Sequence, residues 1–110
     1  MYKVLRVRRH KKIRKRVIGT KNRPRLAVFR SGKHIYTQII DDSEGITLVA
    51  VSDIKETGAK KERAYKVGKK LAEKATKRKI KSVVFDRGGF KFQGRVAELA
   101  KGAREGGLQF

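Results

Sequence analysis

The feature that most constrains this sequence is the uneven placement of its charge. Residues 1–25 contain twelve lysines and arginines and no acidic residue, whereas all 10 acidic residues lie further along the chain. A segment this basic and this poor in apolar residues cannot bury enough surface to fold alone. A solvated basic helix is the alternative, but the run lacks the carboxylates that would pair with it. We predict a flexible basic arm at residues 1–22 and a single folded domain at residues 23–110.

The net charge indicates a polyanionic partner. Lysine and arginine number 31 against 10 acidic residues, which gives a net charge of +21 that opposes the compact state by self-repulsion. The candidate partners are RNA, DNA and an anionic membrane. A membrane-surface helix needs a wide apolar face, which the arm lacks, and no stretch has the length of a membrane span. The absence of cysteine excludes disulfides and suits the cytosol. We therefore expect no membrane partner.

Hydrophobic periodicity predicts an α/β fold for the rest of the chain. Residues alternate with a period of two in the first half, and turn signals such as Ser31-Gly32-Lys33 separate the runs, which favours an antiparallel meander. A strand that follows a helix is expected to pair in parallel. The result is a mixed four-stranded sheet in β-β-β-α-β-α order. The predicted strands are 25–31, 34–42, 46–51 and 80–85, and the predicted helices are 59–77 and 94–105.

Three groups of residues are candidates for RNA contact. The first is the arm and its continuation, where arginine can grip a phosphate with two parallel hydrogen bonds. The second is the polar part of the first hairpin, which offers donors and an aromatic ring, although an ordinary solvated sheet face is an equal alternative. In the arm the candidates are Arg8, Arg9, Lys11, Lys12, Arg14, Lys15, Arg16, Arg23 and Arg25; in the hairpin they are Arg30, Ser31, Lys33, His34, Tyr36 and Gln38.

The third group is the glycine loop before the last helix. Two adjacent glycines let the backbone approach another chain closely, and a helix N-terminus suits a phosphate. The alternative is that Phe90 and Phe92 belong to the core and the glycines only form a turn. The candidate residues are Arg87, Gly88, Gly89, Lys91 and Arg95.

Catalytic and metal-dependent functions find little support. Ser31, His34 and Asp41 could be imagined as a triad, but a strand holds the aspartate far from the histidine, and no nucleophile elbow exists. Two histidines without cysteine do not make a zinc site. A magnesium-dependent nuclease needs converging carboxylates, which the first strand lacks. We expect Asp86 to organise the loop through the backbone or Arg87. We predict no enzymatic activity, cofactor or metal.

Four segments of the sequence are distinctive. They are RPRLAVFRS at 23–31, KHIYTQIIDD at 33–42, FDRGGF at 85–90 with GRV at 94–96, and AREGGL at 103–108 with terminal Phe110. All four resemble one family, protein eighteen of the large ribosomal subunit. The resemblance is collinear and covers nearly the whole chain. It departs at Phe92-Gln93, where the family commonly has Tyr-His, and at residues 52–60, which look shorter.

The resemblance implies a ribonuclease-H-like topology and a structural role in a bacterial-type ribosome. The partners would be 5S rRNA, 23S rRNA and neighbouring proteins of the central protuberance such as protein five. The protein would be monomeric within the cytoplasmic ribosome, with no small-molecule substrate. The alternatives are the small-subunit protein that shares the fold, a ribonuclease-H-like nuclease and a DNA-packaging protein.

Overall fold

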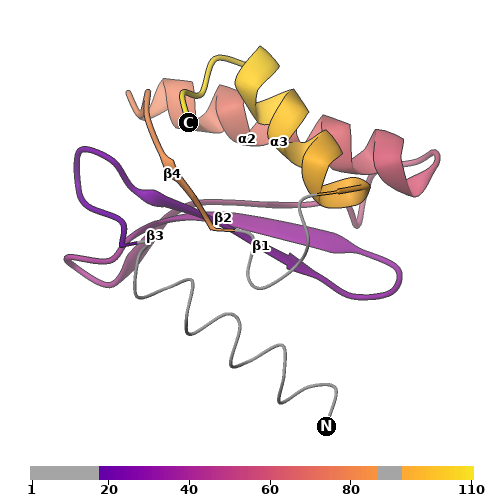
Figure 1. The fold of residues 1–110 in the computed structure, drawn as a ribbon, viewed down its shortest axis with the longest axis horizontal. Helices are drawn as coiled ribbons and strands as arrows, with labels where there is room; N and C mark the ends of the chain where they lie inside the picture. Colours follow the sequence, from indigo (N-terminus) through magenta and orange to yellow (C-terminus); the bar gives the residue numbers. More distant parts are fainter. Residues whose placement is uncertain (1–17, 87–92) are drawn as a thin grey trace, which may run out of the picture.

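The computed structural model describes residues 18–86 and 93–110, and in them two helices lie on one side of a four-stranded sheet (Figure 1). The predicted fold class and element order are confirmed. The strands are β1 (Arg25–Arg30), β2 (Ile35–Asp41), β3 (Ile46–Ser52) and β4 (Val84–Asp86), and the helices are α2 (Lys60–Lys77) and α3 (Arg95–Glu105).

The sheet has the strand order β3-β2-β1-β4. The first three strands form the predicted antiparallel meander, and β4 pairs with β1 in parallel after the α2 crossover. In the β1–β2 register Phe29 stands opposite Tyr36, and Arg30 stands opposite Ile35. Because side chains alternate between the two faces of a sheet, these two neighbouring pairs point to opposite faces.

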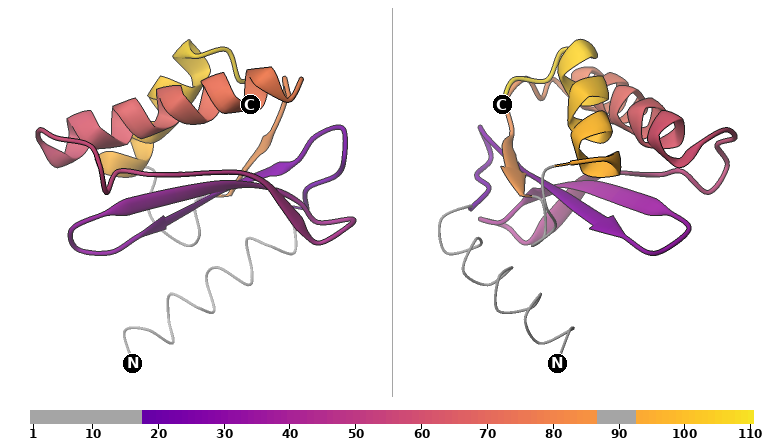
Figure 2. Two further views of the ribbon diagram at one scale, coloured as in Figure 1. Left: turned by 180° about the vertical axis from the view of Figure 1, so that it is seen from behind. Right: turned by 45° about the vertical axis from the view of Figure 1, so that its right-hand side comes forward.

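One face of the sheet carries the core. Leu26 and Val28 of β1 and Ile35 and Ile39 of β2 are fully buried against the helices, together with Val67, Leu71 and Leu99 among others. The helices cover this face in both views of Figure 2. On the other face, Tyr36 is 37% exposed and Phe29 is 39% exposed. We call this second side the open face.

The two helices cross at a pair of glycines. A Cβ atom on Gly68 would lie 2.1 Å from the carbonyl oxygen of Leu99, and one on Gly102 would lie 2.2 Å from that of Tyr65. Hydrogen in place of Cβ at both positions therefore lets the backbones of α2 and α3 meet directly.

The fourth strand is shorter than predicted, and it begins at Val84 rather than Ile80. The Ile80 N–H donates to the carbonyl of Ala75, and Lys79 has a φ of 63°. This is the hydrogen-bond pattern that closes a helix C-terminus through a left-handed residue, so Ile80 completes α2 instead of starting a strand. Ser82 then pairs with Gln109 in an isolated parallel bridge before the chain enters the sheet.

Candidate nucleic-acid interface

The structure places only part of the predicted RNA-contacting set. The predicted residues Arg8, Arg9, Lys11, Lys12, Arg14, Lys15 and Arg16 of the arm, and Arg87, Gly88, Gly89 and Lys91 of the glycine loop, lie outside the described residues. The described residues include all the hairpin candidates, together with Arg23, Arg25 and Arg95.

The hairpin divides its candidate residues between two faces. Tyr36 and Gln38 lie on the open face with Phe29, and the rings of His34 and Tyr36 meet edge to face with centroids 6.5 Å apart. Arg30 belongs to the side that faces the helices, at the hairpin end. The open face therefore presents two exposed rings and an amide, a combination suited to unpaired RNA bases and their edges.

Basic side chains from both helices hold the hairpin turn. Arg95 Nη2 donates to the carbonyl of Ser31 at 3.2 Å, Lys60 Nζ to that of Gly32 at 2.8 Å, and Arg63 Nη2 to that of Lys33 at 3.1 Å. Three consecutive carbonyl groups of the turn thus each accept a hydrogen bond from a cationic side chain. We call Arg30, Lys60, Arg63 and Arg95 the tip cluster.

A buried carboxylate organises the same end of the hairpin. Asp53 is fully buried, and its Oδ1 accepts hydrogen bonds from the backbone N–H of Ile35 at 3.1 Å and stands 3.0 Å from His34 Nδ1. Its Oδ2 lies 3.6 Å from Arg63 Nε. Ser31 Oγ also accepts from the N–H of His34 at 3.1 Å, so the turn is fixed from within before any partner binds.

Burial and nearby positive charge together lower the pKa of Arg95. Burial lowers the pKa of its guanidinium, repulsion from Arg30 and Arg63 lowers it further, and Asp53 opposes the change. Arginine remains charged at neutral pH despite such a shift. The contributions of Arg30 and Arg63 reflect like charges close to Arg95, an arrangement that favours the binding of an anion.

Arg25 has an internal role, and we therefore leave it out of the candidate surface. The residue is 3% exposed. Its Nε lies 2.9 Å from Asp42 Oδ2, and its Nη1 lies 2.8 Å from Asp86 Oδ2. Burial alone would lower the pKa of the guanidinium, but the hydrogen bonds and charges of the two carboxylates outweigh it and raise the pKa.

Asp86 also has an internal role. It is fully buried, and its Oδ2 lies 2.8 Å from Arg25 Nη1. The expectation that it organises the glycine loop through the backbone or Arg87 concerns partners outside the described residues. Two carboxylates do converge here, yet a guanidinium already occupies the position between them. Among the described residues, no group of three or more histidine and acidic side chains could hold a metal ion.

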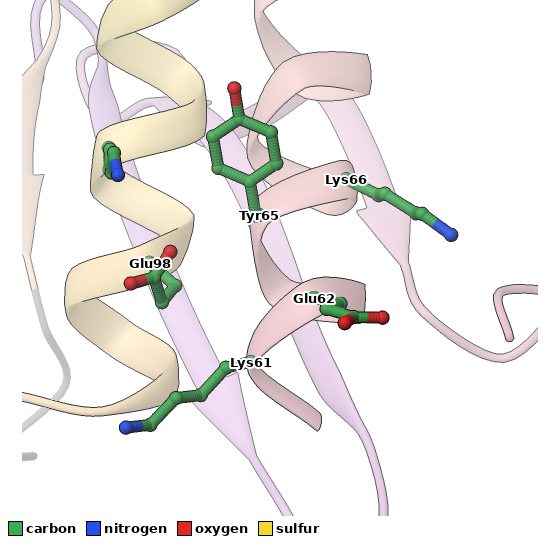
Figure 3. A pocket seen from close by; sticks show the side chains of 6 residues that line it. Lys61, Glu62, Tyr65, Lys66 and Glu98 are labelled. Atoms are coloured by element: carbon green, nitrogen blue, oxygen red, sulfur yellow. The ribbon is translucent and has the colours of Figure 1, made fainter. Parts of the chain in front are cut away.

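A groove between the helices has the mixed charge of an ordinary surface. It has a volume of about 500 Å³ and lies between α2 and α3 (Figure 3). Tyr65 stands between the helices, while Lys66 and Glu62 point away from α3. The acidic and basic groups do not converge on one point, so we base no site on this groove. In the described part of the chain, no helix is long and apolar enough to cross a membrane.

Sequence reasoning missed Phe29, Lys60, Arg63 and Asp53. Phe29 could have been found, because alternation along the strand places it on the face opposite the core residues Leu26 and Val28. The other three gave no local signal, since they reach the turn from positions about twenty to thirty residues away along the chain.

The fold and this surface define a class of protein: a small, strongly basic α/β protein with one sheet face left uncovered by its helices. Comparison with known proteins specifies the class further. A family model for ribosomal L18 of archaea, bacteria, mitochondria and chloroplasts matches residues 2–110. The chain belongs to this family, and it is a ribosomal protein of the large subunit.

Individual bacterial relatives agree with the family match. Large ribosomal subunit protein uL18 of Clostridium botulinum (strain Langeland) is 57% identical over 109 residues, which cover 96% of this chain and 92% of the relative. The protein of the same name from Pseudothermotoga lettingae is 57% identical over 115 residues, with 98% and 94% covered. The protein of the same name from Lactobacillus johnsonii is 56% identical over 110 residues, which cover 96% of this chain and 92% of the relative.

Proposed function

We propose that this protein binds 5S rRNA and helps attach it to 23S rRNA in the central protuberance of the large subunit. The observation that carries the proposal is the family match over residues 2–110, which places the chain among large-subunit ribosomal proteins. The role is structural rather than catalytic. The protein acts as a monomer in the cytoplasmic ribosome, beside neighbouring proteins such as protein five.

Two parts of the chain divide the binding. The basic arm attracts any phosphate chain, because neutralising phosphates releases counterions whatever the base sequence. Preference for one RNA requires groups fixed in space that match its shape and its exposed bases. The open face supplies such groups, since Phe29, Tyr36 and Gln38 are held in register by the β1–β2 ladder.

The test compares wild-type protein with Tyr36→Ala and Tyr36→Phe. Binding is measured to 5S rRNA, to an unrelated RNA hairpin and to random duplex DNA at one salt concentration. Loss of base stacking costs ~1–3 kcal/mol, so Tyr36→Ala should lose roughly 5- to 150-fold in affinity for 5S rRNA. Tyr36→Phe keeps the ring and should lose much less. Affinity for the other two nucleic acids should change little.

Ile54→Ala is the matched control, because Ile54 is 59% exposed and lies outside the open face. It should leave all three affinities unchanged. Equal affinity of the wild-type protein for 5S rRNA and for duplex DNA would refute the proposed function. If the wild-type protein prefers 5S rRNA and both Tyr36 variants bind like wild type, the proposed function stands. The selective surface then lies elsewhere.

A further inference from the structure

The tip cluster points to a second RNA contact that is separate from the open face. We propose that Arg63 and Arg95, with Arg30 and Lys60 beside them, hold one backbone phosphate of RNA on the helix side of the hairpin. The identity of the RNA rests on the proposed function; the phosphate site itself does not.

The first argument is geometric. Arg63 and Arg95 come from different helices, yet their guanidinium groups bind carbonyls two residues apart in the same turn. Each group uses only part of its five N–H donors there. Arg63 Nε faces Asp53 Oδ2 at 3.6 Å, whereas Arg95 Nη1 is buried and has no hydrogen-bond acceptor. The remaining donors of these two guanidinium groups are available to the oxygens of a bound phosphate.

The second argument is electrostatic. Arg30 and Arg63 both repel Arg95, and the opposing carboxylate is Asp53. That carboxylate is fully buried and already accepts hydrogen bonds from the turn. Holding like charges together is unfavourable for the free protein. An anion that binds between them removes this cost and makes strong charge-assisted hydrogen bonds.

The third argument concerns which anion binds. Arg30 and Phe29 are adjacent in β1, and their cross-strand partners are adjacent in β2. An RNA strand that passes around the hairpin end can therefore meet the rings of the open face and the tip cluster together. A carboxylate of a neighbouring protein would use the same donors, but it would not contribute to the salt dependence of RNA binding.

The test measures that salt dependence. Affinity for 5S rRNA is followed between ~50 and ~200 mM salt, where each phosphate contact contributes about 0.7–0.9 to the slope of log K against log salt. Arg95→Gln and Arg63→Gln should each lower the slope by about that amount and weaken binding on the order of tenfold. Because both arginines serve one phosphate, the double variant should lose about one contact, not two.

Lys74→Gln is the matched control. It removes one positive charge from an exposed position on α2. The site is refuted if Lys74→Gln lowers the slope as much as Arg95→Gln does, or if neither arginine variant changes the slope. Thermal unfolding shows whether each variant is still folded. Arg63 also contacts Asp53, so if Arg63→Gln is destabilised, the result for Arg95→Gln alone tests the site.

An unrelated RNA hairpin measured in parallel separates the two proposals. A phosphate site lowers the slope for both RNAs, even if the wild-type protein shows no preference for 5S rRNA. In that case the proposed function fails and the phosphate site stands. If the wild-type protein prefers 5S rRNA and Arg95→Gln keeps its slope, the site fails and the function stands.

Discussion

Arg25 lies where three segments of the chain meet. Asp42 Oδ2 accepts hydrogen bonds from Arg25 and, at 2.7 Å, from the N–H of Gly19, where the arm joins the body. Asp86, the last residue of β4, binds the same guanidinium. One buried arginine therefore links Asp42, which also holds Gly19, to Asp86 at the end of β4.

Removal of this arginine should strongly destabilise the protein. Arg25→Met leaves Asp86 buried without its cation, which costs about 3–5 kcal/mol in the free energy of unfolding. Urea denaturation measures the loss. Arg23→Met removes the same charge from an exposed position two residues earlier and should change stability by less than ~0.5 kcal/mol.

The pH dependence follows from the raised pKa of Arg25. A group whose folded pKa is raised stabilises fully below its unfolded pKa, which for arginine lies far above neutral pH. It loses that contribution only as pH rises through the folded pKa. The difference in the free energy of unfolding between wild type and Arg25→Met should therefore not decrease between about pH 6 and about pH 10. A variant as stable as wild type throughout this range would show that the ion pair contributes nothing.

The sequence could not reveal this role. Arg25 stands in a basic run and has the appearance of one more phosphate-binding residue. Its two carboxylates are 17 and 61 residues away in the chain. The hairpin candidates were easier to predict, because alternation within one strand shows which side chains share a face.

At the level of elements, the crossing of α2 and α3 depends on two glycines, Gly68 and Gly102, which have no Cβ atom. Helical periodicity predicted both helices and their apolar stripes correctly. It did not show that Gly68 and Gly102 meet the opposite backbone, because the crossing point depends on how two distant segments pack. The fourth strand was misplaced for a related reason, since Ile80 suits a strand but caps α2 once Lys79 adopts its left-handed conformation.

Gly68→Ala should force the helices apart. Its Cβ would approach the Leu99 carbonyl to 2.1 Å, and that oxygen belongs to the backbone of α3, so it cannot move aside alone. Overpacking of this kind costs typically ~1–3 kcal/mol. Thermal or urea unfolding of the variant measures the cost.

Gly32→Ala is the contrasting substitution, because no atom lies within 4 Å of the Cβ that it would add. It should be neutral or slightly stabilising, as alanine has fewer conformations in the unfolded chain. Equal effects of the two substitutions would mean that the helix crossing is looser than the structure shows.

At the level of the whole molecule, stability and binding both depend on the net charge of +21. Repulsion among exposed cations destabilises the free protein, whereas the Arg25 ion pair is buried and weakly screened. Raising salt from ~10 to ~150 mM shortens the screening length from about 30 to about 8 Å, so the Tm of the free protein should rise. Differential scanning calorimetry would detect the change.

Deletion of residues 1–17 provides the control for this effect. It removes nine basic residues but keeps Gly19 and its hydrogen bond to Asp42. The shortened protein should unfold at a similar temperature, respond less to salt and bind all RNAs more weakly. A Tm that falls with added salt would show that attractive surface pairs outweigh the repulsion.

The parallel pairing of β4 with β1 has a consequence for the order of events during synthesis. Arg25 must wait for Asp86, 61 residues later, before its second ion pair can form. At a translation rate of ~5–20 residues per second, this interval lasts roughly 3–12 s. Until β4 is made, β1 lacks its parallel neighbour and Arg25 has only one of its two carboxylates. The β1–β2 hairpin that carries the open face can therefore form before the sheet is complete.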